Sequence, residues 1–482
     1  MLNITPLVRI YGTRRLRKLA AMNAADIQQR QLLGLVARAS RTTFGRDHDF
    51  KSIRSVTEFQ ARVPLRRYED FQERYWGDAF PDLRGVTWPS RVPYLAVTSG
   101  TTSGRTKYIP CTNEMISSNT MAGLDLICHH LASRPGSKIL GGKSFMLGGS
   151  TDFTDEAPGI RSGDLSGIMT ANLPWWFRSR SFPSQELASV TDWELKVGRM
   201  VRALDGEDIR LIGGTPSWLL IFFDKLAAHR GDSSPDLAKY FPNLELMIHG
   251  GVDFKPYRAR FEALIANTRA ELREVYPASE GFIGVADQAP EDGLRLMLDT
   301  GLFYEFVPVD ELDARQPTRH WAGTVQRGIN YALVVSSCAG LWSYVLGDTV
   351  ELVSRNPLRL KVTGRTSYMM SAFGEHLIAD EIEAAVRDGG VAIGSDVRDW
   401  SVGAVHASDD DSRGGHLYIV EFAGEVPSEA RLAHFARTLD AALCATNEDY
   451  EAHRSEGFGM NPPQAIALSP GEFAEWMKSR GQ

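Results

Sequence analysis

Residues 98–107 combine the three kinds of group that bind polyphosphates. The segment follows a short apolar run and reads Thr98, Ser99, Gly100, Thr101, Thr102, Ser103, Gly104, Arg105, Thr106 and Lys107. Glycines let backbone N–H groups approach a phosphate, hydroxyls donate hydrogen bonds, and cations offset negative charge. The spacing differs from that of a Walker A loop, which requires GxxxxGK[ST]. The segment is therefore a candidate phosphate-binding loop, although its composition also suits a polar hairpin tip.

A second candidate site lies at residues 276–281, with the sequence YPASEG. An aromatic face can stack on a nucleobase, and this short loop also carries a hydroxyl and the carboxylate of Glu280. A carboxylate near phosphates requires a cation between them, and Mg²⁺ is bound by carboxylate and phosphate oxygens. The alternative is a turn with a solvated glutamate, which the residues alone do not exclude.

Asp348 and Arg365 are two further candidates, each directly after a glycine. One carboxylate can accept hydrogen bonds from two vicinal hydroxyls, so Asp348 could hold a ribose; the alternative is an aspartate in a β-turn. Arg365 lies at a predicted domain boundary, where the pattern of strands and helices changes. On this evidence alone it could be a surface arginine in an interdomain turn.

The elements that would position these residues alternate between strands and helices. Apolar runs predict strands at residues 94–97, 144–147, 209–212, 244–248 and 269–275. Strands that stop at glycine turns before helices imply a largely parallel α/β sheet, and ligands of such sheets lie beyond the carboxyl ends of the strands. Residues 302–353 are richer in strands. From residue 364 the sequence predicts a smaller α+β unit, with helices at 379–387 and 428–444 and strands at 401–406 and 416–422.

Taken together, these segments resemble a known family. The loop TSGTTSGRTK resembles the phosphate-binding signature of the adenylate-forming superfamily, which includes acyl-CoA synthetases, nonribosomal adenylation domains and luciferases. The extra residue around Ser103-Gly104 and the following YIP more closely resemble one branch, the Gretchen Hagen family of acyl acid amido synthetases, named from plant auxin-responsive proteins and also found in bacteria. Segments similar to this family's motifs follow in the expected order: TTFGRDHDF with VPLRRYEDF, GTPSWLLIFFDKL, VYPASEGFIG, and AGLWSYVLGDTVEL followed by VTGRTSYMMSAFGEHL.

The resemblance implies a fold, two cofactors and a set of roles. The fold is α/β, with a large N-terminal adenylate-forming domain of mixed β-sheets and helices at residues 1–363, joined by a hinge to a small mobile α+β domain at residues 364–482. The implied cofactors are ATP and Mg²⁺. Lys107, Glu280 and Arg365 are expected to take part in catalysis.

In this interpretation the whole loop 98–107 binds phosphates and Glu280 is the Mg²⁺ ligand. Tyr276 is the adenine platform, Ser279 contacts a phosphate, Asp348 holds the ribose, and Arg365 contacts the ribose or a phosphate. Two further candidates, Glu375 and His376, begin a loop of the smaller domain that is expected to face the nucleotide.

Three features depart from the family's pattern. Pro277 stands where the wider superfamily commonly has glycine, and the family often has arginine where Ser343 or Val345 stands. Family members usually continue past a segment like FAEWMKSRG to a lysine that is implied to contact the α-phosphate region. Here the sequence ends at Gln482, with Lys478 expected on the preceding helix. Either the sequence ends early, or Lys107 and Arg105 supply the charge, or adenylation is weak.

Composition narrows the class of protein. The net charge of −7 over 482 residues disfavours a nucleic-acid binder, and no apolar run approaches the roughly 18 residues of a membrane span. The four cysteines are far apart, which predicts free thiols and a cytoplasmic protein.

The basic N-terminal residues predict an amphipathic helix with arginine and lysine facing solvent; a targeting segment is the alternative. The pair His129-His130 cannot by itself define a metal site, and both are expected to be surface or partly buried histidines. The residues 175–177, WWF, could line an acyl pocket or pack in the core.

The expected function is ATP-dependent activation of a small carboxylic acid as acyl-AMP, with release of pyrophosphate, followed by transfer of the acyl group to an amine, expected to be that of an amino acid. The alternatives are transfer to CoA or a carrier thiol, and a nucleotide-binding pseudoenzyme that lacks the usual C-terminal lysine. The sequence names neither the acid nor the amine, and it leaves the oligomeric state open.

Overall fold

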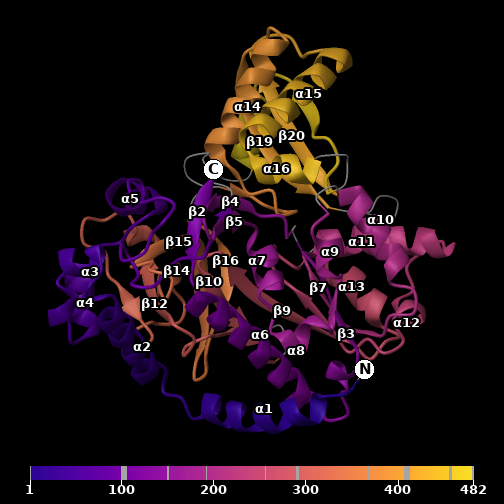
Figure 1. Cartoon of the computed structure of the whole chain (residues 1–482). Coiled ribbons are helices and arrows are strands. Elements are labelled where there is room, and N and C mark those ends of the chain that lie inside the picture. Colours follow the sequence, from indigo (N-terminus) through magenta and orange to yellow (C-terminus); the bar gives the residue numbers. More distant parts are fainter. Residues whose placement is uncertain are drawn as a thin grey trace.

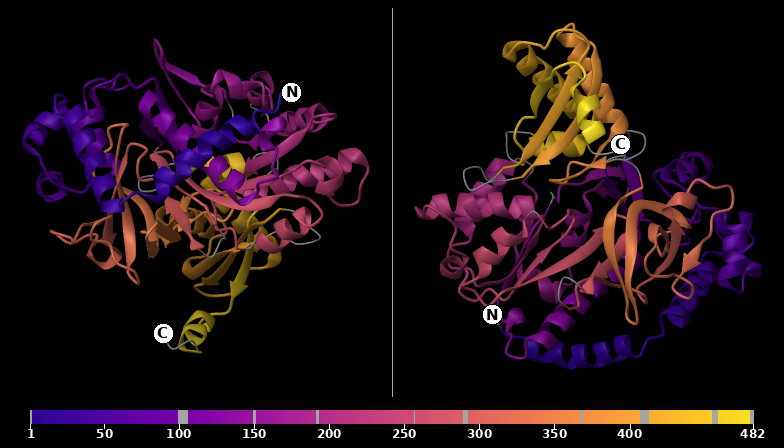
Figure 2. Two further views of the ribbon diagram at one scale, coloured as in Figure 1. Left: turned by 90° about the horizontal axis from the view of Figure 1, so that it is seen from below. Right: turned by 180° about the vertical axis from the view of Figure 1, so that it is seen from behind.

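The computed structural model describes residues 2–98, 106–148, 151–190, 193–255, 257–288, 292–366, 369–406, 413–454 and 459–479. A large domain carries a small domain on one side (Figure 1), and the view from behind in Figure 2 shows helix α1 (Thr5–Ala20) along the opposite side. The chain has the expected α/β class, with mixed sheets in the large domain and a smaller α+β unit after it. Among the described residues, every helix is too short or too polar to span a bilayer.

The main sheet has twelve strands and joins a parallel half to an antiparallel half. Its order is β13 (His320–Trp321), β12 (Leu302–Pro308), β14 (Asn330–Ser337), β15 (Tyr344–Arg355), β16 (Leu358–Arg365), β11 (Leu294–Leu296), β10 (Gly281–Val285), β9 (Glu271–Ala278), β8 (Leu246–His249), β7 (Ile209–Gly214), β3 (Lys143–Leu147) and β6 (Ser181–Phe182). The strands from β6 to β9 pair in parallel. All pairs from β9 to β13 are antiparallel.

The prediction of a largely parallel sheet is therefore wrong for one half of it. The physical reason is the length of the connections. Only two residues, Ser279 and Glu280, separate β9 from β10, and so short a connection can only make a hairpin of antiparallel strands. A crossover helix, which parallel pairing requires, is present between β7 and β8 as α11 (Pro216–Arg230).

A second sheet has the order β2 (Lys107–Cys111), β1 (Tyr94–Thr98), β5 (Ile160–Gly163) and β4 (Thr154–Ala157). Strands β1 and β2 are antiparallel, and Thr98 lies opposite Lys107. The candidate phosphate loop therefore connects the two ends of a hairpin. Its residues Ser99, Gly100, Thr101, Thr102, Ser103, Gly104 and Arg105 lie outside the described residues.

Helices surround both sheets. Besides α1 and α11 they are α2 (Ala24–Ala39), α3 (Thr43–Asp47), α4 (Val56–Arg62), α5 (Tyr68–Phe71), α6 (Asn113–Ser133), α7 (Leu165–Ala171), α8 (Trp175–Arg178), α9 (Gln185–Ala188), α10 (Trp193–Ala203), α12 (Leu237–Tyr240) and α13 (Arg258–Ile265). The apolar spacing on α2 buries Leu32 and Val36 in the core. Proline at the start of α11 suits a first helical turn, where its missing N–H costs no hydrogen bond.

The expected N-terminal helix is confirmed, but its basic residues do not all face solvent. Arg15 of α1 is buried and forms ion pairs with Asp125 of α6 and with Asp299. A guanidinium can be buried here because the two carboxylates accept four hydrogen bonds from its Nε, Nη1 and Nη2 atoms. The four cysteines are free thiols, as the sequence predicts.

The small domain has its own sheet and its own core. The sheet has the order β19 (Val397–Val405), β20 (Gly415–Phe422) and β21 (Gln464–Leu468). The remaining elements are β17 (Met369–Met370), β18 (Leu377–Ile378), α14 (Ala379–Ala392), α15 (Glu429–Thr446), α16 (Glu448–Arg454) and α17 (Glu472–Ser479). The first helix extends five residues beyond its predicted end at residue 387. Helix α17 includes position 478, where the sequence predicts a helix.

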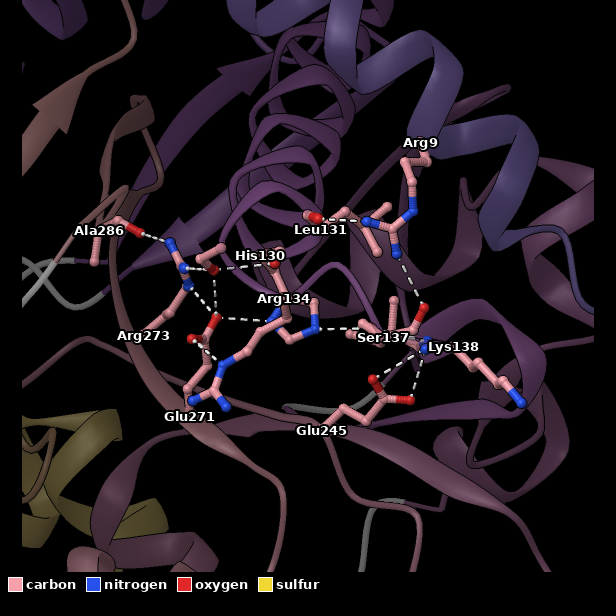
Figure 3. A network of polar contacts seen from close by, with 12 residues as sticks. Arg9, His130, Leu131, Arg134, Ser137, Lys138, Glu245, Glu271, Arg273 and Ala286 are labelled. Atoms are coloured by element: carbon pink, nitrogen blue, oxygen red, sulfur yellow. Dashed lines mark hydrogen bonds and ion pairs between the residues drawn. The ribbon is translucent and has the colours of Figure 1, made fainter.

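A polar network fixes the base of the main sheet to the helices behind it (Figure 3). Glu271, at the start of β9, accepts hydrogen bonds from His130 Nδ1 at 2.7 Å, Arg273 Nε at 2.7 Å and Arg134 Nε at 3.2 Å. Burial alone would raise the pKa of Glu271, but the hydrogen bonds from His130 and Arg273 outweigh it and hold this pKa at about 2. Arg9 of α1 donates to the carbonyls of Leu131 and Ser137. His130 is fully buried in this network, so the expectation of a surface or partly buried histidine is wrong at this position.

We expect Glu271→Gln to lower the free energy of unfolding by about 1–3 kcal/mol at pH 7, since the change leaves Arg273 and His130 with a neutral partner. The folded pKa of Glu271 lies below its unfolded value of 4.5. The ionised carboxylate therefore stabilises the protein above pH 4.5, and this contribution is lost as the pH falls from 4.5 toward 2. Urea unfolding followed by tryptophan fluorescence checks both statements.

The matched control is Glu114→Gln, which removes an ion pair with Arg38 that is half exposed on the arginine side. We expect this control to cost less than about 1 kcal/mol. An equal loss in both variants, or a Glu271→Gln deficit that stays constant down to pH 3, would contradict the role given to Glu271.

Candidate functional site

A cavity of about 2150 Å³ lies between the large and the small domain. The residues that end the parallel strands line it, among them Leu147, Gly214 and His249. This position agrees with the expectation that ligands lie beyond the carboxyl ends of the strands. Seven candidate residues of the large domain that the structure describes also line it: Thr98, Lys107, Tyr276, Ser279, Glu280, Asp348 and Arg365. Residues far apart in the sequence thus converge on one space.

Glu280 lies at the tip of the β9–β10 hairpin and is buried, with 9% of its surface exposed. Gly281 follows it with a φ of 155°, and a Cβ at this position would lie 2.8 Å from the side chain of Leu302. Only glycine therefore allows the turn to pack this tightly. Burial raises the pKa of Glu280, although a hydrogen bond from the Tyr344 hydroxyl and the charge of Lys107 partly offset this. The alternative of a solvated turn glutamate is wrong.

Lys107 begins β2 and is also buried, with 6% of its surface exposed. Burial lowers the pKa of Lys107, and the charges of Glu69 and Glu280 oppose that shift. The Nζ atom lies 3.9 Å from Glu69 Oε1 and 5.5 Å from the centre of the Tyr68 ring. An ammonium over an aromatic face is stabilised by the ring's quadrupole. A cation is therefore held at the wall of the cavity, at the last position of the candidate phosphate loop 98–107.

Tyr276, Asp348 and Arg365 form a chain of contacts across three strands. Asp348 lies opposite Arg365 in the β15–β16 ladder. The Tyr276 hydroxyl donates to Asp348 Oδ2, and Arg365 Nη1 donates to Oδ1. Asp348 is therefore in a strand and not in a β-turn, and Arg365 is at a strand end with its side chain mostly buried. Both alternative interpretations of these residues are wrong.

The ring of Tyr276 packs in the core of the large domain, and its hydroxyl is engaged by Asp348. Tyr276 also lines the cavity, so its role as an adenine platform stays a prediction. Ser279 and Thr98 are half-buried at the cavity wall. Their expected phosphate contacts likewise stay predictions.

The two candidates of the small domain, Glu375 and His376, have different environments in the structure. Glu375 is fully buried and accepts hydrogen bonds from His416 Nε2, at 2.8 Å, and from the backbone N–H groups of Ala372 and Phe373. It does not line the cavity, whereas His376 does. Glu375 thus has a structural position, and the expectation that it faces a nucleotide is not met.

The residues of the WWF segment, 175–177, also differ in their environments. Trp175 is 83% exposed, while Phe177 lines the cavity, and the side chain of Trp176 lies outside the described residues. His129 is partly buried, in agreement with the expectation, and this burial lowers its pKa to about 4.

Sequence reasoning missed several residues of the cavity wall. Tyr344, which donates to Glu280, sits inside a motif that was assigned to the ribose alone. Lys196 of α10 is buried and lines the cavity, and burial lowers its pKa to about 8. Trp218 of α11 and Glu69 of α5 also approach the site. These side chains come from separate helices, so no local spacing in the sequence identifies them.

The residues fit a magnesium ion that is shared with a substrate, and not a dedicated metal cage. Among the described residues, no group of three or more His, Cys, Asp or Glu side chains is arranged to hold a metal. Glu280 is a buried carboxylate for which the described part of the chain provides no ion pair within 4 Å. Mg²⁺ commonly takes one or two carboxylates and completes its coordination with water and phosphate oxygens. One such carboxylate is available here.

Comparison with known proteins gives consistent results. The chain matches the GH3 family N-terminal domain over residues 14–198, the GH3 family central domain over residues 295–365 and the GH3 family C-terminal domain over residues 380–482. A comparison with curated proteins gives no match.

Solved structures share the fold over nearly the whole chain. A GH3.15 acyl acid amido synthetase in complex with 2,4-DB is 18% identical, covers 100% of this chain and 93% of its own, and has a TM-score of 0.63. Another structure of a GH3.15 acyl acid amido synthetase is 17% identical, with coverage of 97% and 90% and a TM-score of 0.61. A 2-hydroxyisobutyryl-CoA ligase in complex with 2-HIB-AMP and CoA is 15% identical, with coverage of 95% and 92% and a TM-score of 0.58.

The buried charge of Glu280 predicts a gain in stability when it is removed. The folded pKa of Glu280 lies above its unfolded value of 4.5, so the ionised form disfavours folding at pH 7. We expect Glu280→Gln to raise the melting temperature of the ligand-free protein by about 1–3 °C at pH 7. The gain should vanish as the pH falls below 4.5, where the group is protonated in both states.

Differential scanning fluorimetry at several pH values measures this shift. Glu186→Gln, at an exposed position of α9, is the control and should leave the melting temperature unchanged. A fall in the melting temperature of Glu280→Gln would mean that the carboxylate is stabilised by its surroundings.

Proposed function

The chain belongs to the GH3 family, and from this membership and the convergence of charged residues on one cavity we propose that it is an ATP-dependent acid–amine ligase. Its substrates are ATP, a small carboxylic acid and an amine, which we take to be an amino acid. The observation that carries the proposal is the placement of Lys107, Glu280, Asp348 and Arg365 around a single cavity at the carboxyl ends of the strands.

The chemistry requires activation of the acid before the amide can form. A carboxylate is a poor electrophile because oxide is a poor leaving group. Attack of its oxygen on the α-phosphorus of ATP forms acyl-AMP and releases pyrophosphate. The amine then attacks the acyl carbon, the amide C–N bond forms, and AMP leaves with the electron pair of the broken C–O bond.

In the first step the protein positions the reactants and balances charge. The loop at residues 98–107 would bind the β- and γ-phosphates, with Lys107 as the cation at its end. Asp348 would accept hydrogen bonds from the ribose hydroxyls, and Tyr276 and Arg365 keep this carboxylate in place. Arg365 would also lie close enough to the ribose or α-phosphate to contact it.

Glu280 would hold a magnesium ion, which would offset the negative charge of the phosphates when it is bound. The Tyr344 hydroxyl donates a hydrogen bond to the Glu280 carboxylate, and both residues line the cavity. Burial raises the pKa of Glu280 and so disfavours its ionised form. A bound cation would stabilise the ionised form and lower this pKa.

We further propose that the small domain rotates about residues 364–365 between the two steps. Strand β16 of the main sheet ends at Arg365, and the small domain's own core begins at Met370. The proposal places the reaction in the cytoplasm, where ATP is supplied. Transfer to CoA or a carrier thiol is a second candidate, favoured by the shared fold with a CoA ligase.

We expect Glu280→Ala to reduce acid-dependent ATP–pyrophosphate exchange by about 10²–10³-fold, the usual effect of removing one charge contact to a transition state. Exchange is measured with radiolabelled pyrophosphate across aryl, indole and fatty acids, which also identifies the acid. The control Glu186→Ala should retain full exchange. Retained exchange with normal magnesium dependence in Glu280→Ala would falsify the role of Glu280.

The acceptor is identified by AMP release with the selected acid in the presence of either CoA or the twenty amino acids. We expect AMP release to depend on an amino acid, because the ligase proposed here forms an amide. Release that depends on CoA alone would establish the second candidate. Nucleotide binding without any acid-dependent AMP would establish a pseudoenzyme.

A further inference from the structure

The loop at residues 371–376 brings the small domain to the wall of the cavity. It connects β17 to β18, and two of its residues have positive φ: Gly374, with a φ of 106°, and His376, with a φ of 45°. Asp49 and Ser343 are the other non-glycine residues with positive φ in the described part of the chain. Such a conformation costs free energy and persists where the surrounding contacts hold it, often at functional sites.

The contacts of Glu375 explain how the loop is held. Its carboxylate accepts from Ala372 N at 3.1 Å, from Phe373 N at 2.7 Å and from His416 Nε2 at 2.8 Å, all away from solvent. The glutamate therefore points into the small domain. The next residue, His376, lines the cavity together with Gly374.

The loop also contacts the large domain directly. The Tyr257 hydroxyl donates to the carbonyl of Ala372 at 2.9 Å, and Ser217 Oγ donates to the carbonyl of Phe373 at 3.4 Å. Ser217 lies at the start of α11, directly after β7, and Tyr257 lies after β8. The loop is thereby placed at the carboxyl ends of the parallel strands, on the side of the cavity formed by the large domain.

His376 is paired with a carboxylate from a third element. Its Nδ1 donates to Asp449 Oδ2 of α16 at 3.0 Å, and both side chains are 35% exposed and line the cavity. Asn447 Nδ2 donates to the carbonyl of His376 at 3.3 Å, which ties the same two segments a second time. An ionised carboxylate can only accept hydrogen bonds, so the proton of this contact lies on His376 Nδ1. In the neutral imidazole the lone pair is then on Nε2. Within the described ranges, no residue hydrogen-bonds to that Nε2.

We propose that His376, oriented by Asp449, is the general base that deprotonates the acceptor amine in the amide-forming step. The inference rests on the proposed function. An amino acid carries an ammonium group at neutral pH, which has no lone pair and cannot attack acyl-AMP. His376 Nε2 takes one proton from this ammonium, and the neutral nitrogen then forms the C–N bond while the C–O bond to AMP breaks. The second nitrogen proton and the proton on His376 pass to water.

Other charged groups on the elements around the loop do not compete for this role. His453 of α16 lies against Gly374 and His406, after β19, lies against Phe373, but burial lowers the pKa of each and so disfavours its protonated form. The segment between β8 and α13 contributes Asp253, Lys255 and Arg258 to the same cavity wall. The two cations of this segment, Lys255 and Arg258, are suited to attract the carboxylate of an amino acid. Asp253 belongs to the same segment, which follows β8 in the large domain.

The test separates deprotonation from all earlier steps. His376→Asn keeps a residue that tolerates positive φ and can still donate to Asp449, but it lacks a basic nitrogen. The acyl-adenylate is formed by the full-length enzyme from ATP and the acid selected by the exchange screen, and its consumption is followed with two acceptors. One acceptor is the mixture of twenty amino acids; the other is hydroxylamine, which is already unprotonated at neutral pH.

We expect His376→Asn to slow amide formation with amino acids at least about 100-fold at pH 7. Hydroxamate formation with hydroxylamine and ATP–pyrophosphate exchange should both stay within about threefold of the wild type. Raising the pH to 9 should recover much of the loss, because the amine then deprotonates in solution. Asp449→Asn, which changes a positioning residue, should show the same selective loss at about tenfold, and His434→Ala, at an exposed position of α15, should show none.

Three results would overturn the proposal: unchanged amide formation, an equal slowing with hydroxylamine, or a loss of exchange in His376→Asn. The second would make His376 a residue that only positions the acyl-adenylate, and the third would place it in the first step. Failure of the proposed function is distinguishable, because the wild-type enzyme itself would then show no acid-dependent exchange or no amide with any amino acid.

Discussion

The structure depends on holding two opposite charges, those of Lys107 and Glu280, out of water at the wall of one cavity. Taking an ionised group out of water costs free energy, and a nearby charge such as Glu69, 3.9 Å from Lys107 Nζ, offsets this cost only in part. Burial lowers the pKa of Lys107 and raises that of Glu280, so in each case the protein disfavours the charged form. Such an arrangement is unfavourable for stability alone. It is favourable for a ligand that brings phosphate oxygens to the lysine and a divalent cation to the glutamate.

Three pairs of antiparallel strands position the charged residues around the cavity. Lys107 stands at one end of the β1–β2 hairpin, Glu280 at the tip of β9–β10, and Asp348 faces Arg365 across β15–β16. Strand β9 is also where the main sheet changes from parallel to antiparallel pairing. The parallel half contributes strand ends and helix starts to the cavity, and the antiparallel half contributes side chains held in register. Both kinds of sheet are therefore needed to form this site.

Much of the site could be predicted from the sequence because each motif is local. The loop 98–107, Glu280 and Asp348 stand out by residue type and by resemblance to a family, and those that the structure describes share one cavity. Pairing between strands is different, since it depends on connection length and packing, and the parallel character of the sheet was overestimated. Glu375 and His376 are adjacent in sequence, but only the three-dimensional contacts show that Glu375 bonds within the small domain while His376 lines the cavity. Tyr344 and Lys196 could not be assigned because their neighbours in space are distant in sequence.

The most direct test of the account is a crystal structure of the protein with magnesium and α,β-methylene-ATP, which cannot release pyrophosphate. The account predicts one nucleotide in the cavity between the domains. Its ribose should contact Asp348, its β- and γ-phosphates should lie against the 98–107 hairpin near Lys107, and a metal ion should bridge Glu280 and the phosphates. A nucleotide bound elsewhere, or an empty cavity at saturating nucleotide, would contradict it.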